Sequence, residues 1–280
     1  MGVNVGGPTS NRKPPSKATV VTVTSGKGGV GKTTTTANIG VALAKLNQRV
    51  VLIDADIGLR NLDIVMGLEN RIVYDLVDVV EGRCKLRQAM IKHKQFPDLY
   101  LIPAAQTRDK SAVSPSDMIQ ITNELKADFD FVLIDSPAGI ERGLRNAIAP
   151  ADEVLVVTNP EVSAVRDADR IIGMLEAENK GPGQLILNRL KIDMVKKGEM
   201  LSASDVTDIL AIKIIGIVPE DELVIPASNS GIPVTLNENS RAGTAFRNIA
   251  RRLCGEKVPL MNLEDKSGFF QRLSKLFSGT

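Results

Sequence analysis

Residues 26–33 read GKGGVGKT and carry the residue types that bind phosphate groups. They fit the pattern G-x-x-x-x-G-K-[ST] and lie between a β-branched strand pattern at 20–24 and a helical pattern at 33–46. Glycines let such a loop fold tightly around phosphates, and the N-terminus of the next helix adds a favourable dipole. Lys32 is expected to reach the β- and γ-phosphates of ATP, and Thr33 to ligate Mg²⁺. The loop residues predicted to contact the nucleotide are Gly28, Gly29, Val30, Gly31, Lys32, Thr33 and Thr34.

Three aspartates follow apolar runs that have the length of buried strands. Asp135 ends the run 131–134 in the form of a Walker B strand, so its carboxylate is predicted to orient the Mg²⁺ shell. Asp54 and Asp56 follow the run 50–53. An aspartate at a strand end is often only a turn former, but three of them beside a phosphate loop favour a catalytic arrangement. No Glu or Gln stands in an obvious general-base position, so we expect slow hydrolysis unless a partner completes the site.

A second lysine, Lys27, extends the phosphate pattern. Residues 27–33 meet K-G-G-x-G-K-[ST] in full, and on these residues the chain resembles the deviant Walker A, or signature-lysine, ATPases of the ParA/MinD family. The resemblance implies that Lys27 reaches across a dimer interface to the partner's ATP, as an arginine finger does, and hence an ATP-dependent homodimer. It also implies that Asp56 positions the attacking water and that Asp54 lies near the waters on Mg²⁺. The implied catalytic residues are Lys27, Lys32 and Asp56, and the implied metal-site residues are Thr33, Asp54 and Asp135.

The same resemblance implies an adenine site made by an Asn at a strand end and a loop that contains Pro. Asn188 and Arg189 follow the apolar run 185–187. Pro219, Glu220 and Asp221 follow the run 214–218. Ligands of open α/β sheets bind at the carboxyl ends of strands, which is where both segments are expected. Taken alone, Asn and Pro at such places are ordinary turn residues.

Apolar runs alternate with helical patterns from residue 20 onward. This alternation predicts an α/β fold, a single P-loop NTPase domain with a mostly parallel twisted sheet, helices on both faces and a C-terminal amphipathic helix. Only 3% of the residues are aromatic and 43% are hydrophobic, which suits buried parallel strands and argues against nucleic-acid readers that stack bases. The predicted strands are 20–24, 50–53, 99–102, 131–134, 154–157, 184–187 and 214–218, and the predicted helices are 33–46, 118–125, 161–178, 202–211 and 241–254.

Composition divides the chain into three parts. Residues 1–17 are rich in Gly, Pro, Ser and basic residues and contain no acid, which predicts a disordered basic arm, with the remnant of a transit peptide as the alternative. Residues 18–261 are predicted to form the ATPase domain. Residues 262–280 are predicted to be a tether followed by a membrane-targeting helix.

The pattern of residues 268–277 resembles an amphipathic helix that lies on anionic lipid, with apolar side chains on one face and positive charge around it. The alternative is a terminal helix that packs on its own domain. Burying the apolar side chains returns at most about 7–15 kcal/mol, and ordering the segment costs about 10–15 kcal/mol, so one tail binds marginally and the two tails of a dimer bind together. The residues predicted to contact the membrane are Phe269, Phe270, Arg272, Leu273, Lys275, Leu276 and Phe277.

The resemblance covers about residues 20–277. It is strongest with the family members that place the division site, and the stretches that carry it are 54–63, 103–109, 158–162 and the tail. It implies a peripheral protein on the inner face of the cell membrane or of a plastid envelope. The implied partners are MinE, MinC or another division inhibitor, and an anionic membrane, with no specific nucleic acid.

Two other functions stay open. A ParA-type DNA or cargo partition ATPase needs a basic binding face, which the net charge of +2 does not indicate. An ATP-gated membrane scaffold would bind ATP with negligible turnover. An iron–sulfur relative is disfavoured because the two cysteines, Cys84 and Cys254, form no CxxC pair.

Overall fold

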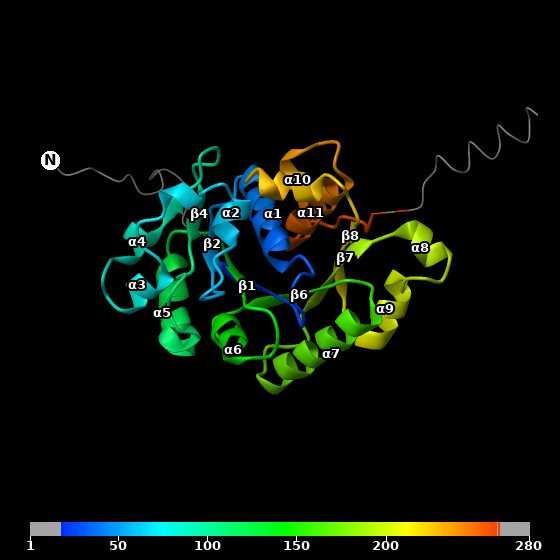
Figure 1. Cartoon of the computed structure of the whole chain (residues 1–280), viewed down its shortest axis with the longest axis horizontal. Helices are drawn as coiled ribbons and strands as arrows, with labels where there is room; N and C mark the ends of the chain where they lie inside the picture. The colour runs from blue at the N-terminus through cyan, green and yellow to red at the C-terminus, as the bar shows by residue number, and fades with distance from the viewer. Residues whose placement is uncertain (1–17, 262, 264–280) are drawn as a thin grey trace, which may run out of the picture.

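The structure is a computed structural model, and it describes residues 18–261 and 263 (Figure 1). The predicted basic arm at 1–17 and the predicted membrane helix at 268–277 lie outside the described residues. Within the described part, the predicted α/β fold is confirmed: one mostly parallel sheet lies between two layers of helices.

The sheet has eight strands in the order β3-β4-β2-β5-β1-β6-β7-β8. Every neighbouring pair is parallel except β3 and β4, which are antiparallel. The predicted strands are all present, and β3 is an edge strand that its two residues made too short to predict. The bounds are β1 Thr19–Thr24, β2 Val50–Asp54, β3 Ile91–Lys92, β4 Leu99–Ile102, β5 Phe131–Asp135, β6 Glu153–Thr158, β7 Gln184–Leu190 and β8 Ile214–Pro219.

Helices cover both faces of the sheet. The α1 and α11 helices lie on one face, and α5, α6, α7 and α9 lie on the other (Figure 1). The five predicted helices are present, and the short helices between them were not predicted. The bounds are α1 Lys32–Lys45, α2 Leu62–Val65, α3 Leu76–Val80, α4 Leu86–Ala89, α5 Pro115–Leu125, α6 Arg142–Ile148, α7 Val162–Ala177, α8 Ile192–Lys196, α9 Ala203–Leu210, α10 Val224–Asn229 and α11 Arg241–Leu253.

The core is made mostly of aliphatic side chains on both faces of the sheet, with a few buried aromatic ones such as Phe129 and Phe246. In β1, Val21 and Val23 pack under α1 and α11, whereas Val20 packs into the opposite layer. Strands buried on both faces have continuous apolar sequences, which is why these strands could be predicted from the sequence. The parallel arrangement carries the carboxyl ends of β1, β2 and β5 to one edge, where the polar residues of the site gather. Among the described residues, no helix combines the length and apolar character needed to cross a bilayer.

Candidate nucleotide-binding site

The phosphate loop joins β1 to α1, and its conformation depends on glycine. Gly29 has φ of 80° and Gly31 has φ of 95°, in the left-handed region that favours glycine. A Cβ atom on Gly31 would lie 2.4 Å from the Asn188 side-chain nitrogen. That nitrogen donates a hydrogen bond of 2.7 Å to the carbonyl of Val30. The loop is therefore held from the far strand β7, and it has no room for a side chain at Gly31.

The Asp135 carboxylate, at the end of β5, accepts hydrogen bonds from three side chains of α1. Lys32 Nζ lies 3.0 Å from its Oδ1 atom, and Thr33 Oγ1 lies 2.7 Å from its Oδ2 atom. The Thr36 hydroxyl donates to Oδ1 at 3.1 Å. Lys32 and Asp135 are both buried, so their ion pair is shielded from water and depends on these partners.

Thr36 was missed by the sequence reasoning. It stands one helical turn after Lys32 and therefore on the same face of α1. Its hydroxyl also donates to the Lys32 carbonyl at 3.1 Å, so it is shared between the helix and Asp135. The spacing from Lys32 was the signal that could have found it.

Asp54 lies opposite Asp135 in the neighbouring strand β2. Its carboxylate accepts backbone N–H bonds from Asp56 at 3.0 Å, from Asn61 at 3.3 Å and from Leu62 at 3.2 Å. Burial, with a smaller repulsion from Asp135, raises its pKa from 3.8 to about 7. The chain between Asp54 and α2 is thus wrapped around a carboxyl group whose titration is shifted to near neutral pH.

The donors at this edge fit Mg²⁺. The Thr33 hydroxyl and the carboxylates of Asp54 and Asp135 are hard oxygen donors. Burial is the main cause of the raised pKa of Asp54, and a cation would relieve the smaller contribution, the repulsion from Asp135. The described residues contain no cluster of three or more His, Cys, Asp or Glu able to hold a metal ion. Mg²⁺ is usually bound by one or two carboxylates together with waters and nucleotide phosphates, so such a cluster is not required.

The two remaining predicted catalytic residues lie at the same edge but are more open. Lys27 is exposed, and its carbonyl accepts a hydrogen bond from the Ser25 hydroxyl at 3.0 Å. Asp56 is half-buried, two residues beyond the strand that carries Asp54. Lys27 belongs to the phosphate loop, and Asp56 follows the carboxyl end of β2; the catalytic roles of both stay predictions.

The predicted adenine residues line one pocket beside the phosphate loop. Asn188 and Arg189 lie within β7 rather than after it, where the pairing with β8 becomes irregular beyond Leu187. Arg189 has φ of 58°, an unusual value for a residue with a side chain. The pocket's walls include Gly31, Thr34, Asn188, Arg189, Pro219, Glu220 and Asp221.

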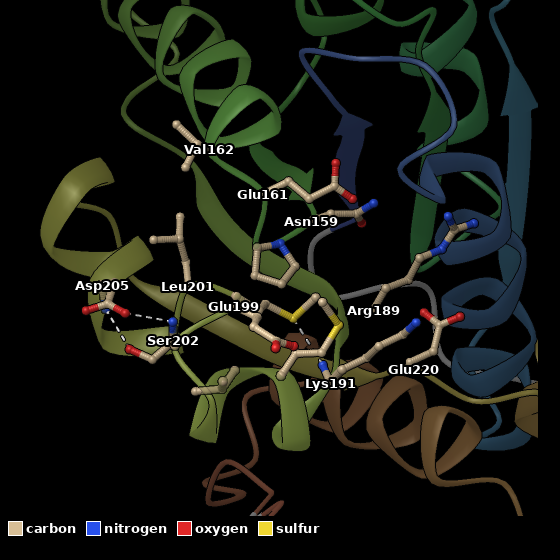
Figure 2. Close-up of a pocket in the computed structure, with 15 residues that line it drawn as sticks. Asn159, Glu161, Val162, Arg189, Lys191, Glu199, Leu201, Ser202, Asp205 and Glu220 are labelled. Atoms are coloured by element: carbon tan, nitrogen blue, oxygen red, sulfur yellow. Dashed lines mark hydrogen bonds between the residues drawn. The ribbon is translucent and has the colours of Figure 1, made fainter.

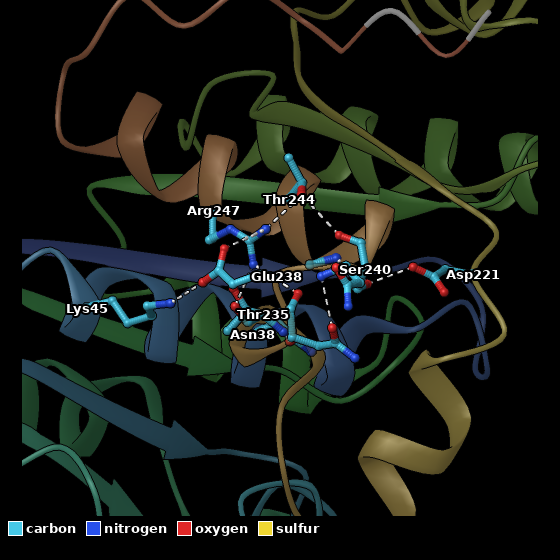
Figure 3. Close-up of polar contacts among 11 residues, drawn as sticks. Asn38, Lys45, Asp221, Thr235, Glu238, Ser240, Thr244 and Arg247 are labelled. Atoms are coloured by element: carbon cyan, nitrogen blue, oxygen red, sulfur yellow. Dashed lines mark hydrogen bonds and ion pairs between the residues drawn. The ribbon is translucent and has the colours of Figure 1, made fainter. Parts of the chain in front are cut away.

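Asp221 has a structural role in that wall. Its Oδ2 atom accepts hydrogen bonds from the Ser240 hydroxyl at 2.6 Å and from the backbone N–H of Ala242 at 3.1 Å (Figure 3). Its Oδ1 atom accepts from the N–H of Leu223 at 3.0 Å. These bonds lower the pKa of Asp221 against the opposing effect of burial, its largest single influence. The carboxylate is therefore used to fix the loop after β8 to the start of α11.

The same region ties that loop back to α1. Asn38 Oδ1 accepts the backbone N–H of Thr235 at 2.8 Å, and Lys45 forms an ion pair of 2.9 Å with Glu238 (Figure 3). Because α1 begins in the phosphate loop, these contacts hold the two halves of the pocket together. The polar residues of this network carried no pattern that would have identified them in the sequence.

Comparison with known proteins finds relatives over most of the chain. Residues 18–181 match the model of a family described as an AAA domain. The septum site-determining protein MinD of Bacillus subtilis is 56% identical over 260 residues, which cover 92% of this chain and 97% of that protein.

Two solved structures are similar in shape as well as in sequence. A MinC:MinD cell division protein complex from Aquifex aeolicus contains a chain that is 51% identical, with a TM-score of 0.82, covering 88% of this chain and 99% of its own. MinD from Pyrococcus horikoshii, complexed with Mg-ADP, is 29% identical, with a TM-score of 0.75, covering 86% of this chain and all of its own (100%). Sequence and fold therefore agree in relating this chain to MinD proteins.

Proposed function

Since the chain belongs to the MinD family of septum site-determining ATPases, we propose that it works as a Mg²⁺-dependent, membrane-associated homodimer that hydrolyses ATP when MinE stimulates it. As a family member it is a division-site-determining ATPase of the Min system. The observation that supports the ATP and Mg²⁺ chemistry of this proposal is the convergence of Lys32, Thr33 and Thr36 on Asp135, because it is the arrangement expected of a phosphate-binding lysine beside a carboxylate suited to the metal.

The roles proposed for the site follow from this geometry. When bound, Mg²⁺ would neutralise phosphate charge, and Thr33, Asp54 and Asp135 are the residues that would hold it and its waters. Lys32 would leave Asp135 for the phosphates, since its ammonium already lies at the first turn of α1. Asp56 would orient the attacking water. Residues 28–34 would bind the phosphates through backbone N–H groups.

The base pocket would bind adenine between β7 and the loop after β8. Asn188 would contribute chiefly by fixing the loop, because its amide nitrogen is bonded to Val30. Arg189, Pro219 and Glu220 would form the walls around the base, and Asp221 would keep that loop in place.

Dimerisation would join two such sites through Lys27. Its side chain is exposed beside the phosphate loop, and a lysine held in that position can reach the nucleotide of a second subunit. A relative whose structure is described as a MinC:MinD complex supports MinC, or another division inhibitor, as a partner. MinE would accelerate the slow ATP hydrolysis at this site.

Membrane attachment would be supplied by residues 268–277, joined to the 18–261 ATPase domain by a short tether. One tail is a weak anchor, and a dimer with two tails binds more strongly through effective concentration, by roughly 10²–10⁴-fold. We place the protein at the inner face of the cell membrane, or at the stromal side of a plastid envelope, with residues 1–17 as a basic arm.

Vesicle co-sedimentation tests this proposal. The full chain should sediment with anionic vesicles in Mg-ATP, much less in Mg-ADP, and not at all in Mg-ATP once residues 268–280 are deleted. Phosphate release should rise when vesicles and MinE are added together. Sedimentation that is the same in Mg-ATP and Mg-ADP, or that survives the deletion, contradicts the membrane proposal. Phosphate release that does not rise with vesicles and MinE would favour an ATP-gated scaffold with negligible turnover.

A further inference from the structure

A large groove adjoins the nucleotide site but is not part of it. It lies between the end of β6, the start of α7 and the segment from α8 to α9 (Figure 2). Its volume is about 810 Å³, far more than the base pocket offers. Arg189 and Glu220 line both the groove and the base pocket, so the two spaces share a wall.

The groove is lined by apolar side chains and by carboxylates. Met194, Val195, Met200 and Leu201 supply apolar surface from α8 and the chain that follows it. Carboxylates come from both sides of the groove (Figure 2). The acidic residues are Glu161, Glu199, Asp205 and Glu220, against two cations, Arg189 and Lys191. Such a surface suits an apolar segment that carries positive charge.

One buried group in the groove lacks a partner. Asn159, at the end of β6, is only 7% exposed, and its Oδ1 atom has no hydrogen-bond partner among the described residues. A buried acceptor of this kind is costly to leave unbonded. A lysine or arginine donor brought into the groove would satisfy it.

The described chain ends beside this groove. Leu263 is buried in an apolar cluster against which the partly buried Val195, Met200 and Leu201 pack. Its carbonyl accepts a hydrogen bond of 3.2 Å from Arg241, at the start of α11. Arg241 directly precedes Ala242, whose N–H is bonded to Asp221, the neighbour of the groove residue Glu220. The residues that follow Leu263 therefore start within a few side chains of the groove.

We propose that the groove holds residues 268–277 of the same chain when the protein is not bound to membrane. The four residues 264–267 span up to about 13 Å when extended, and a ten-residue helix is about 15 Å long, so the segment can reach and lie along the groove. Its phenylalanines and leucines would cover the apolar side chains of the groove, and Arg272 and Lys275 would face the carboxylates.

The inference rests on the proposed role of this tail as the membrane anchor and adds a competition to it. The apolar face that would enter lipid is the face that would enter the groove, so the two bound states exclude each other. Because Arg189 and Glu220 line both the groove and the base pocket, a nucleotide in the base pocket would lie against a wall of the groove. The tail would leave the groove as ATP assembles the dimer.

Methionine methyl resonances test the docking directly. A nitroxide is attached at Ser278→Cys in full chain that carries Cys84→Ser and Cys254→Ser, with Mg-ADP bound and Met methyls labelled. The Met194 and Met200 signals should lose at least half their intensity relative to the reduced nitroxide. Met66 and Met118, buried in other parts of the core, are the internal controls. Equal broadening of all four signals would overturn the docking.

Membrane binding supplies the second measurement. Met194→Glu should weaken docking and raise the fraction of Mg-ADP protein that sediments with vesicles at least twofold, with ADP affinity as the check of folding. Lys196→Glu, which places an acid on α8 outside the groove lining, should not raise it. An unchanged fraction in Met194→Glu refutes the competition.

The two measurements also separate this inference from the function beneath it. Normal ATP-dependent sedimentation without selective methyl broadening removes the docking and leaves the membrane function intact. Selective broadening in a protein that never sediments removes the membrane function and keeps the docking.

Discussion

Replacing Asp54 by Asn should change how the stability of the protein depends on pH. Asp54 is 1% exposed, and burial beside Asp135 raises its pKa from 3.8 to about 7. Between those two values the folded protein holds a proton that the unfolded chain releases. The free energy of unfolding must therefore fall as the pH rises through this window, and it stops falling on this account above about pH 7.

The size of the effect follows from the two pKa values. With 3.8 in the unfolded chain and about 7 in the folded protein, this one carboxyl lowers the free energy of unfolding by about 3 kcal/mol between pH 5 and pH 8. Asparagine cannot ionise, so the Asp54→Asn variant lacks this slope. It also replaces one acceptor oxygen by a donor facing backbone N–H groups, which costs a pH-independent amount of about 1–3 kcal/mol.

The measurement is urea unfolding of both proteins at pH 5 and pH 8, without nucleotide and with a chelator present. The wild-type free energy minus that of the variant should be about 3 kcal/mol smaller at pH 8 than at pH 5. Asp205→Asn is the matched control, because hydrogen bonds from Ser202 lower the pKa of that exposed carboxyl and place its titration below this range. A difference between wild type and Asp54→Asn that does not change with pH would refute the assignment of a neutral, buried Asp54.

Three further outcomes are expected. Lys27→Ala should bind ADP normally yet stay monomeric in ATP by light scattering, and a normal dimer would contradict a role across the interface. Asn188→Ala removes the bond to the Val30 carbonyl and should weaken ADP binding about tenfold by calorimetry, in line with a lost buried hydrogen bond; unchanged affinity would show that the loop holds itself. The single histidine, His93, should titrate below 6.5 by NMR, because burial lowers its pKa and the positive charges of Lys94 and Arg71 lower it further. The free energy of unfolding contributed by this group should therefore fall as the pH drops through 6.5. A measured pKa at or above 6.5 would contradict the burial.

The sequence predicted the sheet well because its strands are buried on both faces. A run such as 131–134 is apolar throughout, which is typical of a strand buried on both faces, and the aspartate that follows it lies at the edge of the sheet where the site is. The phosphate loop was equally clear, because Gly31 is required by both its φ and its contact with Asn188. Short elements such as β3 were missed because two residues carry no period.

Side-chain pairing was the part that a single sequence could not give. The bonds of Asp221 join residues about twenty positions apart, and those of Asn188 cross more than a hundred and fifty positions to the phosphate loop. Nothing local distinguishes Asp221 as the anchor of a loop from Asp221 as a ligand of adenine. The distinction needs the position of Ser240, which only the fold supplies.

The two halves of the nucleotide site are also joined behind it, through backbone alone. The N–H groups of Asn61 and Leu62, at the start of α2, bind the Asp54 carboxylate, and Gly67, two residues after the end of α2, packs directly on Gly231 after α10. A Cβ on Gly67 would lie 2.8 Å from the Gly231 carbonyl oxygen, and one on Gly231 would lie 2.6 Å from the Gly67 Cα. No side chain separates the two segments, so a shift of α2 is transmitted to α10 without being absorbed. Since α10 follows the loop that walls the base pocket, the charge on Asp54 and the shape of that pocket are expected to change together.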